Sequence, residues 1–203
     1  DKIKIVYRPT NGHISKATNS ALDVATGEFI GLVDNDDILD KDALYEVVKA
    51  LNSNKKLDMI YSDEDKIALN GKRALPFFKP DYSPDTLLSL NYICHFTVLR
   101  KKIVDEIGGF RSKYDGAQDY DLFLRFVEKT NNIHHISKIL YHWRCSKTST
   151  SLDYNNKSYT LVNGKLAIMD ALKRRNIKAD VLVREDIGRY IIDYKVLKEP
   201  KIS

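Results

Sequence analysis

The residues best suited to chemistry are four consecutive polar side chains, Asp34-Asn35-Asp36-Asp37, which directly follow the apolar run 29–33. The run predicts a buried strand, and open α/β sheets bind ligands where their strands end. Crowded carboxylates repel one another, and a divalent cation would relieve that repulsion. Hard cations such as Mg²⁺ take one or two carboxylates together with phosphate oxygens of a substrate. The cluster is therefore a candidate metal–diphosphate site.

Two other interpretations of the cluster compete with a metal site. A solvated turn followed by a helix cap would use the same residue types, and Asp40 and Asp42 fit that role. For Asp34 and Asp36, the residues alone leave both interpretations open. An EF-hand calcium loop is excluded, because its sixth position would be Leu39 instead of glycine.

Strand and helix patterns alternate around the cluster, and these elements must position it. Apolar runs predict strands at 3–7, 29–33 and 57–61, and helical spacing predicts a helix at 14–25. A second helix follows Asp40. Its expected inner face consists of Leu44, Val47, Val48 and Leu51. This order favours an α/β layered fold with a mostly parallel sheet.

The pattern loosens after residue 61. Asn70-Gly71 is typical of a hairpin turn, and a helix is expected at 119–129. Residues 133–143 predict one or two strands, and 157–175 predict a long helix. Alternating apolar residues at 190–196 predict a half-buried strand.

Composition narrows the class of protein. The 203 residues are 43% hydrophobic, enough for a substantial core, and no run of about 20 apolar residues predicts a membrane span. Two distant cysteines, Cys94 and Cys145, fit a reducing cytoplasm better than a disulfide framework. The net charge of +5 is spread along the chain, so no nucleic-acid partner is expected. A mildly basic surface also suits phosphorylated substrates, or peripheral binding at the inner face of the cell membrane.

Three segments in a fixed order resemble family 2 glycosyltransferases. In that family an Asn-x-Gly-like turn opens a helix that ends in Ala-x-Gly-Glu, and the next strand delivers an Asp-x-Asp motif. The corresponding segments here are 10–19, 25–30 and 34–37. Further motifs resemble the branch that builds bacterial surface polysaccharides. They lie at 61–65, 78–81, 108–110, 118–122 and 140–144.

The resemblance implies a GT-A fold, a three-layer α/β sandwich, and a metal-dependent, inverting sugar transfer. The donor would be a nucleotide-diphosphate sugar, with a UDP-sugar expected, and the acceptor a glycan or lipid-linked glycan. By similarity, Asp119 is the base that takes the acceptor proton, and Asp36 and His142 hold Mn²⁺ or Mg²⁺. The residues assigned to the nucleotide sugar are Asn11, Ser15, Asn19, Asp34, Asn35 and Arg144. The alternatives are a helix cap for Asp119, and purely structural roles for His142 and Arg144.

The chain also departs from the family pattern. Gln118 stands where Glu is commoner, and Thr18 replaces a common Arg. The family's first strand–helix unit, with the Asp that reads the base, has no counterpart, so a partial GT-A domain at 1–152 is expected. Residues 153–203 would form a helix and strand extension leading to a further domain, and 199–203 resemble the opening of another transferase domain.

Two other functions remain open. The chain could be a non-catalytic or degenerate GT-A domain that binds glycan or assists a neighbouring transferase domain. It could also be a nucleotidyltransferase. Neither a Gly-x-Gly-x-x-Gly motif nor a phosphate-loop lysine motif is present, which argues against dinucleotide or ATP binding of those types.

Overall fold

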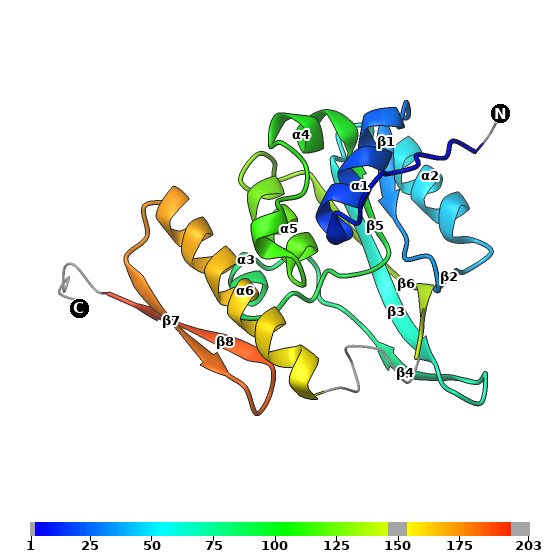
Figure 1. Cartoon of the computed structure of the whole chain (residues 1–203). Helices are drawn as coiled ribbons and strands as arrows, with labels where there is room; N and C mark the ends of the chain where they lie inside the picture. The colour runs from blue at the N-terminus through cyan, green and yellow to red at the C-terminus, as the bar shows by residue number, and fades with distance from the viewer. Residues whose placement is uncertain (1–2, 146–153, 196–203) are drawn as a thin grey trace, which may run out of the picture.

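The computed structural model describes residues 3–145 and 154–195, and side chains from residue 159 onward in the second range (Figure 1). In chain order, the elements are α1 (His13–Val24), β1 (Phe29–Leu32), β2 (Ile38–Leu39), α2 (Ala43–Ser53), β3 (Met59–Ile67), β4 (Arg73–Phe77), α3 (Pro84–Ser89), β5 (Thr97–Arg100), α4 (Lys101–Glu106), the 3₁₀ turn η1 (Ser112–Tyr114), α5 (Gln118–Phe126), β6 (Ile133–Arg144), α6 (Tyr154–Arg174), β7 (Ala179–Arg184) and β8 (Arg189–Tyr194).

The main sheet has the order β1-β5-β3-β6-β2, and β4 pairs with β3. β3 and β6 are parallel, with Met59 opposite Ile133 and Ile67 opposite Arg144. β5 pairs antiparallel with both β1 and β3, and β2 and β4 are also antiparallel to their partners. The α/β fold is therefore confirmed. β1, β3 and β6 run in the same direction, and the sheet is mixed because β5 inserts in reverse between β1 and β3 and because β2 and β4 are antiparallel to β6 and β3.

Helices cover both faces of this sheet and make three layers. On one face, Ala43 and Val47 of α2 pack in a cluster with Ile60, Val98 and Leu140. On the other face, α1, α4 and α5 pack over the sheet (Figure 1). The long helix α6 and the β7–β8 hairpin lie beyond α5 and belong to the same buried core. The proposed boundary at 152/153 falls outside the described residues, so the division into two parts stays a prediction.

Two local predictions are wrong. Residues 3–7 form no strand: Ile3, Ile5 and Tyr7 are 78%, 68% and 88% exposed, because no described strand pairs with them. The inner face of α2 is also rotated. Val47 is buried and Leu51 packs half-buried on the same cluster, as predicted, but Leu44 and Val48 are exposed and Ala43 is buried in their place.

Candidate active site

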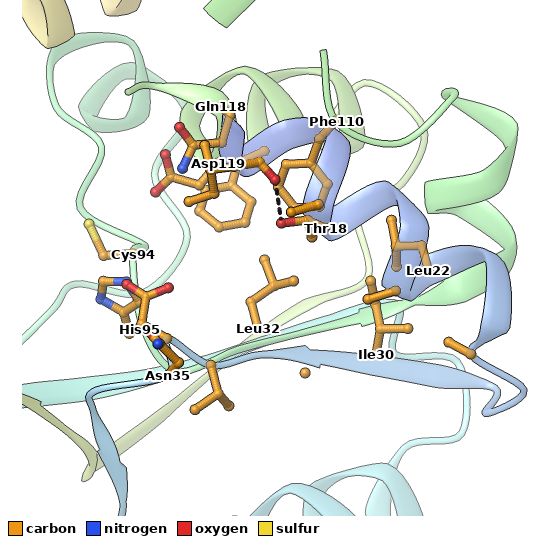
Figure 2. Close-up of a pocket in the computed structure, with 18 of the residues that line it drawn as sticks. Thr18, Leu22, Ile30, Leu32, Asn35, Cys94, His95, Phe110, Gln118 and Asp119 are labelled. Carbon is orange, nitrogen blue, oxygen red and sulfur yellow. Dashed lines mark hydrogen bonds and ion pairs between the residues drawn. The ribbon is translucent and has the colours of Figure 1, made fainter. Parts of the chain in front are cut away.

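A cavity of about 790 Å³ lies between α1, β1 and the start of α5. Its larger part is apolar and is lined by side chains of α1 and β1, such as Leu22 and Ile30. Its polar end is lined by Asp34, Asn35, Cys94, His95, Gln118 and Asp119. Figure 2 shows Gln118 and Asp119 across the cavity from His95 and Asn35. The structure thus brings the predicted base and the predicted donor-binding residues Asp34 and Asn35 to one site.

The turn after β1 is held by Asp37 and Tyr141. The Asp37 carboxylate accepts hydrogen bonds from the Tyr141 hydroxyl (2.5 Å) and the Arg144 backbone N–H (2.7 Å). The Asp34 backbone N–H donates to the same hydroxyl (3.2 Å), and Arg144 Nε donates to the Asp36 carbonyl (2.7 Å). Asp37 is therefore a structural anchor, and Arg144 lies beside Asp36.

Crowding of carboxylates gives the polar end its electrostatic character. Burial raises the pKa of Asp34, and the charges of Asp37, Asp119 and Asp36 raise it further, while His95 opposes them. A cation bound near these carboxylates would relieve their mutual repulsion.

Asp119 is the second residue of α5 and does not cap the helix. The N-cap position is Ala117, which has no side-chain hydrogen bond, whereas Asp119 Oδ2 accepts a hydrogen bond from Asn91 Nδ2 (2.9 Å). The start of a helix stabilises a negative charge. Gln118, the residue that departs from the family pattern, accepts a hydrogen bond from the Gly116 backbone N–H (2.7 Å).

The three polar α1-side residues assigned to the nucleotide have partners within the protein. Asn11 Oδ1 accepts from the His13 backbone N–H (2.9 Å), at the start of α1. Ser15 is buried and donates to Asp115, and Asn19 makes two hydrogen bonds with the backbone of Phe110 (2.8 and 2.9 Å). The contacts of Ser15 and Asn19 fasten α1 to the loops before α5. The assignment of these residues to the nucleotide stays a prediction.

The two predicted metal ligands have different surroundings. Asp36 is exposed, and its carboxylate makes no hydrogen bond or ion pair with the described residues. His142 is buried, with Nδ1 2.6 Å from Asp65 Oδ1 and Nε2 3.6 Å from Asp40 Oδ2. Within residues 3–145 and 159–195, no group of three or more His, Cys, Asp or Glu side chains could hold a metal. Asp36 fits a hard cation that takes most of its ligands from a substrate and water, and no contact supports His142 as a ligand.

A buried acidic run on β3, Asp63-Glu64-Asp65, lies within the motif at 61–65 but was not predicted to border the site. Each carboxylate lies beside a histidine. The N–O distances are 2.8 Å from Asp63 to His135, 3.5 Å from Glu64 to His95 and 2.6 Å from Asp65 to His142. Buried carboxylates need such partners. The signal in the sequence was the acidic run extending the apolar strand, with two histidines seven positions apart on the next parallel strand.

Comparison with known proteins identifies the family. The family model described as glycosyl transferase family 2 matches residues 1–108, more than half of the chain. The chain belongs to glycosyl transferase family 2. Among curated relatives of this family 2 chain, the O-antigen biosynthesis protein RfbC of Myxococcus xanthus is 35% identical over 202 residues, covering 100% of this chain and 16% of RfbC.

Other relatives are also much longer than this chain. The uncharacterised protein y4gI of Sinorhizobium fredii is 40% identical over 198 residues, which cover 97% of this chain and 22% of y4gI. The chondroitin synthase of Pasteurella multocida is 29% identical over 165 residues, covering 79% of this chain and 17% of the synthase. The chain thus spans about a fifth of the length of these relatives.

Solved structures share the fold. Residues 1–349 of Staphylococcus aureus TarS, in complex with UDP-GlcNAc, superpose with a TM-score of 0.59 at 20% identity, covering 85% of this chain and 56% of TarS 1–349. The mannosyltransferase PcManGT of Pyrobaculum calidifontis, in complex with GDP-Man and Mn²⁺, gives 0.59 at 15% identity, covering 82% of this chain and 46% of PcManGT. At these identities the comparison establishes the GT-A fold. No helix among the described residues is long and apolar enough to cross a membrane.

Proposed function

We propose that this chain forms part of a catalytic domain that transfers a sugar from a nucleotide-diphosphate sugar to a glycan acceptor in surface-polysaccharide synthesis. The observation that carries the proposal is the convergence of Asp34 and Asp119 on one cavity, from the end of β1 and the start of α5. Family membership and the similarity to RfbC, an O-antigen biosynthesis protein, support the reaction class. The UDP-GlcNAc and GDP-Man complexes of the structural neighbours support the donor class, with a UDP-sugar as our expectation.

In this proposal, Asp119 is the general base. The acceptor hydroxyl oxygen attacks the anomeric carbon, the carbon–oxygen bond to the diphosphate breaks, and the hydroxyl proton passes to Asp119. A single in-line displacement inverts the anomeric configuration. The hydrogen bond from Asn91 to Asp119 Oδ2 leaves the other carboxylate oxygen to receive the proton.

Asp36 is the proposed protein ligand for Mn²⁺ or Mg²⁺. Asp34 and Asn35 are proposed to contact the donor nucleotide sugar. A bound divalent cation would neutralise charge that develops on the departing diphosphate. We assign Arg144, whose Nε donates to the Asp36 carbonyl, to pair with the oxygens of the same diphosphate.

The experiment uses the complete protein that contains this chain, a panel of radiolabelled nucleotide sugars and Mn²⁺. We expect transfer from one donor class, with loss of at least about tenfold in kcat/KM for Asp34→Asn, because a charge-assisted contact to the donor is removed. Asp193→Asn, on the distant β8, is the matched control. Absence of transfer from every donor, or undiminished transfer by Asp34→Asn, would overturn the proposal.

One observation favours a second candidate, a non-catalytic domain that binds glycan or assists a neighbouring transferase. Asn11, Ser15 and Asn19 are occupied by protein contacts instead of facing the cavity. Calorimetry of the complete protein with UDP and Mn²⁺ separates the candidates. Heat of binding that Asp36→Ala abolishes supports the transferase, and heat that this change leaves intact supports the alternative.

A further inference from the structure

His95 lies where the polar end of the cavity meets the buried carboxylates of β3. It lines the cavity, and its side chain is 21% exposed. The imidazole stacks on Tyr141, with ring centroids 4.6 Å apart and planes at 15°. The Tyr141 hydroxyl is itself fixed by Asp34 and Asp37. The ring of His95 is therefore held on a platform that also holds the turn after β1.

Carboxylates flank both nitrogens of this ring. Nδ1 lies 3.5 Å from Glu64 Oε2, and Nε2 lies 3.8 Å from Asp34 Oδ2. Glu64 is immobilised, because its Oε2 accepts from Lys79 Nζ (3.0 Å) and from the His95 backbone N–H (3.2 Å). The Asp34 side chain is 53% exposed, and its carboxylate accepts no such hydrogen bond from the residues that the structure describes. Of the two carboxylates, Asp34 is thus the one that can move.

The charges around His95 favour its cationic form. Burial acts to lower the pKa of His95, but Glu64, Asp119 and Asp34 outweigh burial and raise it above the ordinary value. Asp34, which lies 3.8 Å from Nε2, is thus one of the carboxylates that favour the cationic imidazole.

We propose that His95 is a positioning residue of the donor site: it tethers the Asp34 carboxylate to the buried Glu64–Lys79 pair and so fixes the orientation in which Asp34 meets the donor. The inference rests on the proposed function, in which Asp34 contacts the nucleotide sugar. In this role His95 serves donor binding but not proton transfer, because the hydrogen bond that holds Asp119 comes from Asn91 and not from His95.

The first test measures kcat and KM for the donor in the complete protein carrying His95→Gln. We expect KM to rise about tenfold while kcat changes less, since the lost contact orders Asp34 but does not move the proton. The Asp34→Asn/His95→Gln double variant should then have the same donor KM as Asp34→Asn alone, because His95 acts on the donor only through Asp34. His134→Gln, at an exposed position on β6, is the matched control. Multiplicative effects of the two changes, or equal losses in kcat and kcat/KM at unchanged KM, would overturn the proposal.

A second test needs no donor. The ring signals of His95, followed by NMR against pH, should titrate at a lower midpoint in Asp34→Asn than in the wild type, and circular dichroism verifies the fold of the variant. An unchanged midpoint would overturn the tether even in an active enzyme. A lowered midpoint in a protein that transfers no sugar would uphold the tether and refute the proposed function, so the two failures are distinguishable.

Discussion

At the scale of single residues, Glu64 of β3 and its neighbour His95 are expected to make stability depend on pH. Burial acts to raise the pKa of Glu64, but His95 and Lys79 outweigh it and hold the pKa below the ordinary 4.5. The pKa of His95 is raised above the ordinary 6.5 despite burial, through Glu64, Asp119 and Asp34. A carboxylate with a lowered pKa stabilises the fold above its unfolded pKa, and a histidine with a raised pKa does so below its unfolded pKa.

We therefore expect the contribution of this pair to the free energy of unfolding to be greatest between pH 4.5 and 6.5. The contribution should decrease at pH values below this window, where Glu64 is protonated, and at pH values above it, where His95 loses its proton. Urea denaturation of the wild type and of Glu64→Gln across this range measures the difference. A difference that does not vary with pH would show that the pair makes no such contribution.

Lys79 gives a second prediction at this scale. Its side chain is fully buried and donates to Glu64 Oε2 and to the Ile93 carbonyl (2.7 Å). Lys79→Met would leave a buried carboxylate without its cation, a change that destabilises proteins by about 3–5 kcal/mol. The exposed Lys72→Met should have almost no effect in the same denaturant titration. Equal stability of the two variants would contradict the buried ion pair.

At the scale of elements, the spacing of apolar residues predicted which segments are helices, but it predicted less well how those helices pack. α1, α2, α5 and α6 lie close to the predicted ranges, since helical spacing of apolar residues is a local property. The rotation of α2 and the insertion of β5 between β1 and β3 depend on contacts between distant segments, which no local pattern contains. Likewise, Asp119 could be assigned from its motif, but the link from His95 to Glu64 requires β3 and β5 to be placed side by side.

The turn between β1 and β2 should depend on the hydroxyl of Tyr141 on β6. Tyr141→Phe removes the hydroxyl that bonds Asp37 and the Asp34 backbone, while keeping the ring beneath His95. We expect a loss of about 0.5–1.5 kcal/mol in unfolding free energy together with weaker donor binding, because the turn loses its anchor. Thermal denaturation and donor KM provide the measurements, with the exposed Tyr45→Phe as control. Unchanged donor KM would show that the turn does not need this hydroxyl.

At the scale of the whole molecule, α6 and the β7–β8 hairpin are joined by a close approach at Gly164. A Cβ at this position would lie 2.0 Å from the Tyr190 hydroxyl oxygen, which donates to the Leu161 carbonyl (3.1 Å). Gly→Ala inside a helix ordinarily stabilises by about 1 kcal/mol. Here we expect Gly164→Ala to lower the melting temperature, and Tyr190→Phe to recover part of that loss in the double variant. Stabilisation by Gly164→Ala alone would contradict this packing.

Asp119, at the cavity shared with Asp34, is the proposed base of the sugar transfer. Its most direct test is the rate of transfer by the complete protein and by Asp119→Asn, at saturating nucleotide sugar and Mn²⁺. We predict a fall in kcat of about 10²–10⁴-fold with donor binding retained, because a general base contributes that much and the amide keeps the shape of the side chain. A variant that transfers sugar at the wild-type rate would show that Asp119 is not the base.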